Sequence, residues 1–353
     1  MKVVGLISGS SLDGLDIALC EFDGLSPDEI SWSCLRADTV PFPAELIERL
    51  RKAVDLSGRD LMSLECDFSR FCVQAVRESL QDHAYDLVCS HGHTVFHHPE
   101  ESWTLQIGDG AMLAEELYVP AITNVRGNDM VLGGQGAPVA PIIERWLIPG
   151  HDYYLNLGGI SNLSIHKNGF ITSFDSGPCN QVLNTWIAEI GLAYDDRGQL
   201  AATGKANSRL IERWAQLPYF HERAPKSLDN SWVHDVFLPL TDRSLSLPDR
   251  LATMVSFIGV QLRRDLEMLD AGPGSLLVTG GGAHNDFMVE AISSELQKLG
   301  ISVVLPASLM IDFKEAILIS LMGYLRYHQL PNTLKTVTGA RKDSISGALY
   351  IPS

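Results

Sequence analysis

The sequence lacks a surplus of positive charge. Lys and Arg number 27 against 43 Asp and Glu, which gives a formal net charge of −16. Nucleic acids and anionic membranes are bound through clustered basic side chains, so both are excluded as partners. An anionic small ligand is still allowed, because exposed charges more than about 8 Å apart are largely screened at physiological salt.

Long apolar runs and paired cysteines are also missing. The sequence begins MKVVGLISGSSLDG, and its apolar stretch is too short for a secretory leader. The most apolar late segment, 309–325, contains Asp312, Lys314 and Glu315, which argues against a membrane span. The six cysteines form no C-x-x-C pair. We therefore expect a cytoplasmic protein with reduced thiols.

What is present predicts two α/β domains. The 353 residues are too many for one ordinary core. The periodicity of apolar residues predicts helices at 43–55, 59–83, 111–118, 181–191, 249–269 and 313–327. It predicts strands at 2–8, 15–22, 85–90, 104–107, 120–124, 153–157, 162–166, 170–174, 275–279 and 301–305. A strand, a Gly/Ser turn and a second strand occur in both halves, which hints at a duplicated fold.

The domain boundary is expected in the Gly- and Pro-rich segment Gly133–Pro141. This gives a first domain of residues 1–140 and a second of residues 141–353. The C-terminal segment of the second domain is free to pack back on the first.

Three Gly-rich turns follow apolar strands, at 9–14, 158–161 and 280–282. The patterns G-x-x-x-x-G-K-[ST] and G-x-G-x-x-G are both absent, so no standard nucleotide fingerprint applies. Backbone N–H groups of such turns can bind phosphate oxygens, because no Cβ blocks their approach. Each turn alone is as consistent with a tight hairpin. Asp13 would repel a phosphate but could hold a hydrated Mg²⁺.

Three polar clusters could carry chemistry. The His-rich segment 90–98 is expected to be a loop, which either binds a divalent metal through His91 and His93, lines a substrate cleft, or is merely solvated. Asp175, after a strand and before a helix, is either a general base or a helix cap. Arg126 and Asp129 either recognise a carboxylate and sugar hydroxyls or form a surface ion pair. The role of Lys226 stays open, and Cys179 is interpreted as a small apolar filler.

Together these segments resemble one family, the anhydro-N-acetylmuramic acid kinases. The matching stretches keep the family's order and span nearly the whole chain. They are GLISGSSLDGLDIAL (5–19), SHGHTVFH (90–97), TLQIGDGAMLAE (104–115), NVRGNDMVLGGQGAP (124–138), LNLGGISNLS (155–164), FDSGPCNQVLN (174–184), TGKAN (203–207), PKS (225–227), LLVTGGGAHN (276–285) and VTGARKDSISGALY (337–350).

The resemblance implies a two-domain actin-like ATPase fold of the hexokinase type, with a deep cleft between α/β domains. It also implies a reaction in cell-wall recycling, in which ATP and water convert 1,6-anhydro-N-acetylmuramic acid to N-acetylmuramic acid 6-phosphate and ADP. ATP and Mg²⁺ are the implied cofactors and the anhydro sugar is the implied partner. A homodimer is compatible with this reading.

The resemblance also assigns roles to residues. Asp175 matches the catalytic aspartate. The ATP phosphates and adenosine would be bound by Gly9, Ser10, Ser11, Leu12, Asp13, Gly14, Leu15, Asp16, Gly158, Gly159, Gly280, Gly281 and Gly282. The sugar would be bound by His91, His93, Thr94, Gln106, Arg126, Asp129, Gln135 and Asn180. Mg²⁺ would be held by Asp13 and Glu315, directly or through water.

Some positions depart from the family's usual residues. Ser10 replaces a usual Thr, His93 a common Gln, Cys179 a frequent Gly and Asn124 a frequent Asp, while Lys314 replaces Met before a retained Glu315. None removes Asp175 or the Gly-rich turns, so activity is expected. The alternatives are a kinase for another amino sugar such as N-acetylglucosamine, a metal-dependent hydrolase built on the histidines, and a catalytically silent sugar sensor.

Overall fold

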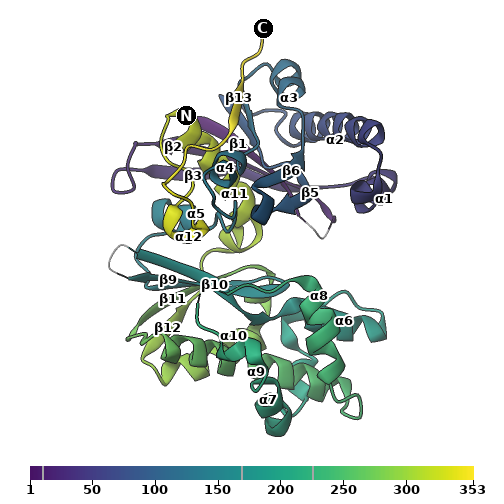
Figure 1. The fold of residues 1–353 in the computed structure, drawn as a ribbon, viewed down its shortest axis with the longest axis vertical. Coiled ribbons are helices and arrows are strands. Elements are labelled where there is room, and N and C mark those ends of the chain that lie inside the picture. Colours follow the sequence, from purple (N-terminus) through teal and green to yellow (C-terminus); the bar gives the residue numbers. More distant parts are fainter. Residues whose placement is uncertain (10–11, 168–169, 225) are drawn as a thin grey trace. The chain divides into compact units, whose positions relative to one another are not determined.

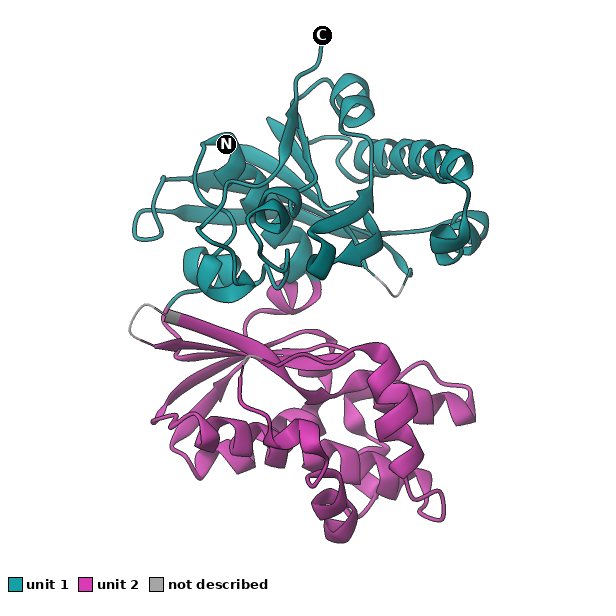
Figure 2. Ribbon diagram, in the orientation of Figure 1, with its two compact units in different colours: residues 1–149, 313–353 teal, residues 150–312 magenta. Residues whose placement is uncertain are grey.

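The computed structural model describes residues 1–9, 12–167, 170–224 and 226–353, and Ser10 and Ser11 of the first Gly-rich turn therefore lie outside the described residues. The chain divides into two compact α/β units (Figures 1 and 2). Unit 1 comprises residues 1–149 and 313–353, and unit 2 comprises residues 150–312. No helix among the described residues is long and apolar enough to cross a membrane.

Unit 1 is built on a six-stranded sheet of order β13-β7-β4-β1-β2-β3. Strands β1, β2 and β3 form an antiparallel meander, and β4 runs parallel to β1 and to β7. These strands are β1 (Lys2–Ser8), β2 (Gly14–Asp23), β3 (Ser31–Pro41), β4 (Leu87–Ser90), β7 (Ala121–Thr123) and β13 (Ala348–Tyr350). A separate two-stranded sheet pairs β5 (His93–His98) with β6 (Trp103–Ile107). The prediction of a loop at 90–98 is therefore wrong for residues 93–98, which form a strand.

Helices cover the sheet of unit 1. They are α1 (Ala44–Arg51), α2 (Gly58–Ser79), α3 (Gly110–Leu117), α4 (Gly127–Val131), α5 (Pro141–Trp146), α12 (Lys335–Thr338) and most of α11 (Ser308–Tyr327). Ser57 caps the N-terminus of α2 with its hydroxyl, which accepts the Asp60 N–H, and the helix buries Leu64, Phe68 and Cys72 on one stripe. Gly5 of β1 lies directly against the α11 backbone, where a Cβ would collide, so glycine permits this close packing.

Unit 2 repeats this plan. Its sheet order is β12-β11-β8-β9-β10, with an antiparallel β8-β9-β10 meander and β11 parallel to β8 and to β12. The strands are β8 (Tyr153–Leu157), β9 (Ile160–Lys167), β10 (Phe170–Pro178), β11 (Gly274–Thr279) and β12 (Ile301–Val304). The order and directions match β7-β4-β1-β2-β3 of unit 1. The hint of a duplicated fold is thus confirmed.

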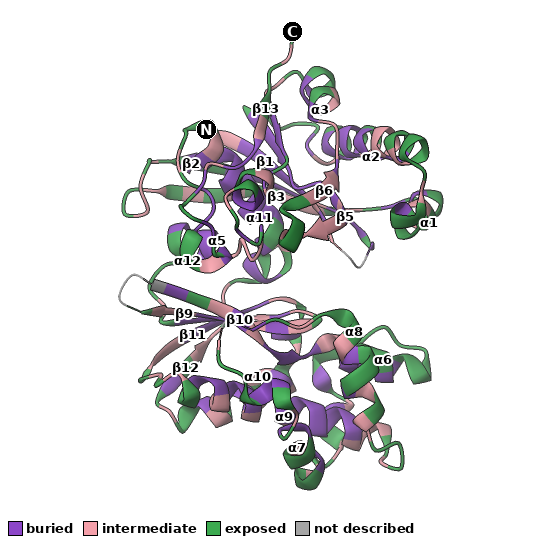
Figure 3. Ribbon diagram, viewed as in Figure 1, coloured by how far each residue is buried: buried purple, intermediate pink, exposed green. Residues whose placement is uncertain are grey.

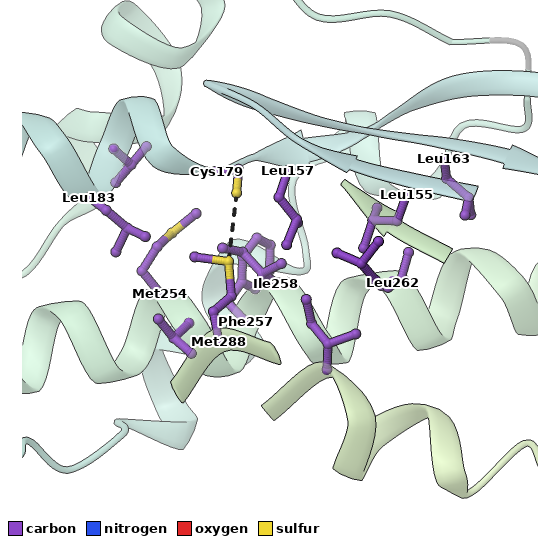
Figure 4. Packing of buried hydrophobic residues seen from close by; sticks show 14 of the residues in the cluster. Leu155, Leu157, Leu163, Cys179, Leu183, Met254, Phe257, Ile258, Leu262 and Met288 are labelled. Atoms are coloured by element: carbon purple, nitrogen blue, oxygen red, sulfur yellow. Dashed lines mark hydrogen bonds between the residues drawn. The ribbon is translucent and has the colours of Figure 1, made fainter. Parts of the chain in front are cut away.

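The core of unit 2 lies between its sheet and α9 (Leu247–Met268). Figure 4 shows strand residues such as Leu155 and Leu157 near Phe257 and Ile258 of α9. Cys179 belongs to this core and points its sulfur at Met288, which confirms its reading as an apolar filler. Buried residues gather in the strands, on one side of α2 and over most of α9 (Figure 3). The other helices are α6 (Asn180–Ile187), α7 (Ser208–Trp214), α8 (Asn230–Trp232) and α10 (Asp286–Gln297).

The unit boundaries differ from the domain ranges expected from the sequence. Unit 1 continues past residue 140 to residue 149, since Trp32 of β3 donates its indole N–H to the Leu147 carbonyl beyond α5. The chain enters unit 2 at residue 150, after the Gly/Pro-rich segment rather than within it. Residues 313–353 return to unit 1, where β13 pairs with β7.

Candidate active site

Asp175 lies near the end of β10 in unit 2, and both of its carboxylate oxygens are held by donors. Asn162 of the neighbouring strand β9 donates its Nδ2 to Oδ1 at 3.0 Å. The Leu228 backbone N–H donates to Oδ2 at 2.9 Å. The N-cap of α6 is Cys179, so the alternative that Asp175 caps this helix is wrong. Asp175 is partly accessible, and its carboxylate has a fixed orientation at a sheet end, as a positioned base requires.

A chain of side-chain hydrogen bonds stands behind Asn162. Ser173 Oγ donates to Asn162 Oδ1 at 2.9 Å, and Ser164 Oγ donates to Ser173 Oγ at 3.0 Å. Because the Asn162 oxygen accepts from Ser173, its amide nitrogen is turned toward Asp175. Asn162 was not singled out by sequence reasoning. The feature that could have identified Asn162 is the pairing of β9 with β10, which places Asn162 directly opposite Asp175.

A buried ion pair anchors the segment that carries Leu228. Lys226 Nζ lies 3.1 Å from Asp265 Oδ1, with the two side chains 2% and 0% exposed. Asp265 also accepts hydrogen bonds from Ser176 Oγ at 2.5 Å and Gln261 Nε2 at 3.1 Å. Burial raises the pKa of Asp265, and the charge of Lys226 acts to lower it. The Lys226 carbonyl accepts the Asp175 N–H at 3.0 Å, so this pair supports the backbone beside the candidate base.

The Gly158–Gly159 turn connects β8 to β9 as the expected hairpin. The two glycine carbonyls face the start of α6. The Gly158 carbonyl accepts the Asn180 N–H at 3.1 Å, and the Gly159 carbonyl accepts the Cys179 N–H at 2.9 Å. These two bonds fix the turn against the N-terminus of α6, the helix that follows Asp175 in the sequence.

Gly281 and Gly282 line a pocket within unit 2, with a volume of about 680 Å³. Its walls include Asn180, Tyr194, Arg197, His284, Asn285, Leu305, Pro306 and Ile311. Gly280 precedes the wall with φ 82°, a left-handed conformation that favours glycine. Asn180 donates its side-chain N–H to the Leu157 carbonyl at 2.8 Å and lines this pocket of unit 2.

The first Gly-rich turn joins β1 to β2 in unit 1. Leu12 adopts φ 57°, and its N–H donates to the Gly9 carbonyl at 3.4 Å. Leu12 and Leu15 bury their side chains in the core, which leaves only their backbone for a ligand. Gly14 lies so close to the Val40 carbonyl of β3 that a Cβ would meet it at 2.7 Å.

Beside this turn, Asp13 and Glu315 both lie within electrostatic reach of Asp16. Burial raises the pKa of Asp16, and the charges of Asp13 and Glu315 raise it further, against a hydrogen bond from Thr39 that lowers it. Asp13 and Glu315 are exposed. Among the described residues no group of three or more His, Cys, Asp or Glu is close enough together to enclose a metal ion.

His91 and Arg126 form a pair in unit 1. Arg126 Nε donates to His91 Nε2 at 2.9 Å, and His91 Nδ1 lies 3.1 Å from the Gly92 carbonyl. Burial, and secondarily the charge of Arg126, lower the pKa of His91 to about 3. The ring is therefore neutral, with its proton on Nδ1 and its acceptor facing the guanidinium. His93 Nδ1 lies 3.0 Å from Ser8 Oγ. Because both His91 nitrogens are engaged, the metal-site interpretation is not supported.

The remaining proposed sugar ligands of unit 1 fall into two groups. Thr94 and Gln106 are opposite each other on β5 and β6, and Gln106 Nε2 lies 3.4 Å from Thr94 Oγ1. Asp129 is fully buried and accepts hydrogen bonds from Thr338 Oγ1 and Gly136 N, each at 2.8 Å. In the structure Asp129 thus shapes the loop that exposes Gln135.

The family model for anhydro-N-acetylmuramic acid kinase matches residues 1–352. The chain belongs to this kinase family. Similar members include the enzymes named anhydro-N-acetylmuramic acid kinase from Synechococcus elongatus, 34% identical over 99% of each chain, and from Paramagnetospirillum magneticum, 36% identical over 84% of each chain.

A third member, from Vibrio vulnificus, is 30% identical over 98% of this chain and 97% of its own length. Among solved structures, the activator of the 2-hydroxyisocaproyl-CoA dehydratase from Clostridium difficile with bound ADPNP aligns with TM-score 0.43 and 11% identity, over 94% of this chain and 98% of that one. Membership of this family does not favour the alternatives of a kinase for another amino sugar or a metal-dependent hydrolase.

Proposed function

We propose that this protein phosphorylates 1,6-anhydro-N-acetylmuramic acid with ATP while water opens the anhydro bridge, in a cytoplasmic step of cell-wall recycling. The observation that carries the proposal is the Asp175 carboxylate, held by Asn162 and Leu228 in a chain whose full length matches the kinase family. The products are N-acetylmuramic acid 6-phosphate and ADP.

The chemistry explains why a fixed carboxylate is needed. The bridge joins C1 to O6, so O6 has no proton that a base could remove. Asp175 would accept a proton from water as the water oxygen bonds to C1. The C1–O6 bond then breaks, O6 bonds to the γ-phosphorus, and the bond from that phosphorus to the β-phosphate oxygen breaks to release ADP. A positioned base typically contributes about 10²–10⁴-fold to the rate.

Within unit 2, the nucleoside would be bound by the pocket that Gly281 and Gly282 line. A volume of about 680 Å³ is in the range of small-molecule sites and suits a nucleoside. The Gly281 and Gly282 wall admits close approach of a ligand to the backbone. Backbone amides of the Gly158–Gly159 turn would stabilise the phosphates, and the resemblance to the family assigns the same role to Gly9, Leu12, Asp13 and Gly14 among the described residues of the first turn.

Asp13 and Glu315 would hold Mg²⁺ through water, because their charges converge near Asp16 without forming a closed set of ligands. Mg²⁺ usually keeps several waters and binds one or two carboxylates together with phosphates. When bound, the ion neutralises charge on the transferring phosphoryl group.

Arg126 would recognise the lactyl carboxylate of the sugar. Its Nε is occupied by His91, which orients the guanidinium and leaves its terminal nitrogens for a bidentate contact. Thr94, Gln106 and Gln135 would contribute hydrogen bonds to sugar hydroxyl and acetamido groups.

Substitution of the proposed base tests the function. Asp175→Asn keeps the size of the side chain, and we expect it to keep the fold and ATP binding while turnover falls at least about 100-fold. With the wild type in ¹⁸O water, the label should appear at C1 of a 6-phosphorylated product. Near-wild-type turnover of the variant would refute the base, and unlabelled product would refute the coupled opening.

A further inference from the structure

Cys20 and Cys34 face each other across the β2–β3 ladder of unit 1. Residues directly opposite in an antiparallel pair have Cα atoms about 4.5–5.5 Å apart, which lies within the range of about 4.4–6.8 Å that a disulfide spans. The two thiols are hydrogen-bonded to each other. In the described part of the chain, the strand registers set no other two cysteines opposite each other.

The two sulfurs differ in access and acidity. Cys20 is fully buried, whereas Cys34 lies on the edge strand β3 and is partly exposed. The hydrogen bond from Cys20 lowers the pKa of Cys34, while the same contact and burial raise the pKa of Cys20. Cys34 Sγ also donates a hydrogen bond to the Arg36 carbonyl oxygen at 3.4 Å. The accessible sulfur is thus the one that ionises more readily, as a reactive thiol requires.

The other four cysteines lack this combination. Cys72, Cys89 and Cys179 are buried, and burial raises the pKa of each thiol. Cys66 is partly exposed, but it lies on α2 and is not part of a cross-strand cysteine pair.

We infer that Cys20 and Cys34 form a peroxide-reactive dithiol site, with Cys34 as the attacking and Cys20 as the resolving sulfur. The Cys34 thiolate attacks one oxygen of hydrogen peroxide, the O–O bond breaks, and hydroxide leaves as the sulfur becomes a sulfenic acid. The Cys20 sulfur then bonds to Cys34 and displaces the sulfenic oxygen as water. Two thiols are oxidised, and one peroxide is reduced to two waters.

The disulfide would join the edge strand β3 to the inner strand β2. A β-bulge lies beside this pair, because Leu19 pairs with Arg36 and Cys20 with Cys34, which leaves Leu35 as the extra residue. A cross-link at this position restricts the unfolded chain between the two cysteines, so the oxidised protein should melt at a higher temperature than the reduced one. This inference is independent of the proposed kinase activity.

The test treats the intact, folded protein with hydrogen peroxide and then counts thiols after denaturation. The six free thiols of the reduced wild type should fall to four, because two are consumed. A digested sample should contain a peptide cross-linked between Cys20 and Cys34, and dithiothreitol should restore all thiols and the lower melting temperature.

Two variants make the test specific. Cys34→Ser should lose the cross-link and the peroxide-dependent rise in melting temperature, whereas Cys66→Ser should keep both. The wild-type peptide map alone decides the matter if a variant fails to fold. Six unreacted thiols, a cross-link between other cysteines, or Cys34 oxidised to sulfinic acid without a cross-link would each overturn the inference.

Discussion

The buried pair of Lys226 and Asp265 offers a quantitative test of how the candidate base is supported. In Lys226→Met the aliphatic volume is largely kept, but Asp265 loses its opposite charge where solvent cannot replace it, since its side chain is 0% exposed. Removing one partner of a buried ion pair costs about 3–5 kcal/mol. Ser176 and Gln261 remain as donors to the carboxylate, so we place the loss near the lower end, at about 3 kcal/mol.

The pH dependence of this loss has a definite sign. Burial already raises the pKa of Asp265, and removal of Lys226 takes away the largest influence that lowers it. The unfolded chain releases the Asp265 proton near pH 4, whereas the folded variant releases it at a higher pH because its pKa is raised. Between these two pKa values, the free energy of unfolding of the variant falls as pH rises. The difference between wild type and Lys226→Met should be larger at pH 8 than at pH 5.

Urea unfolding followed by tryptophan fluorescence measures the effect, and a loss of about 3 kcal/mol should also lower the melting temperature by about 6–12 °C. The matched control is the double variant Lys226→Met/Asp265→Leu, which removes both charges and should recover most of the stability. Equal losses in the single and double variants, or a loss below about 0.5 kcal/mol in the single variant, would refute the reasoning.

Three further outcomes are expected. Arg126→Ala should raise the KM for the anhydro sugar about 10–100-fold, because that factor corresponds to the loss of a hydrogen bond to a charged group. The KM for ATP should change little, and equal changes in the two KM values would contradict the assignment. Asn162→Ala should lower kcat about 10-fold or more, because it removes the hydrogen bond from Asn162 to the Asp175 carboxylate. Ser173→Ala should lower kcat less, since Ser173 donates its hydrogen bond to Asn162 and acts on Asp175 through that side chain. An unchanged kcat of Asn162→Ala in steady-state assays would exclude Asn162 as a positioning residue. Because the pKa of His91 is lowered to about 3, unfolding free energy should fall as pH drops from about 6.5, by up to about 1.4 kcal/mol per pH unit, and His91→Gln should remove this slope in urea titrations.

Elements with strong local signals could be predicted from the sequence. Helices α2 and α9 have capping serines and a continuous apolar stripe, and both appear within a few residues of the expected bounds. The β1–β2 and β8–β9 hairpins were also predictable, because apolar strands flank short Gly/Ser segments. Local patterns suffice where a segment's own residues determine its structure.

Features that depend on distant partners could not be predicted in this way. Strand β3 was missed, since an edge strand exposes much of its length and shows a weak apolar pattern. The His93–His98 segment forms a strand because β6 pairs with it. The Lys226–Asp265 pair spans 39 residues, and its one sequence signal is a carboxylate on the apolar face of the predicted helix 249–269.

The division of the chain bears on how the protein is made. Unit 2 is one continuous segment, residues 150–312, whereas unit 1 is completed by residues 313–353. Domains tend to fold as units while the ribosome is still adding residues. Unit 2 can thus fold before unit 1, because the sheet of unit 1 lacks α11 and β13 until residues 313–353 have been added. A chain that stops shortly after residue 312 should therefore contain a folded unit 2 and an incompletely folded unit 1.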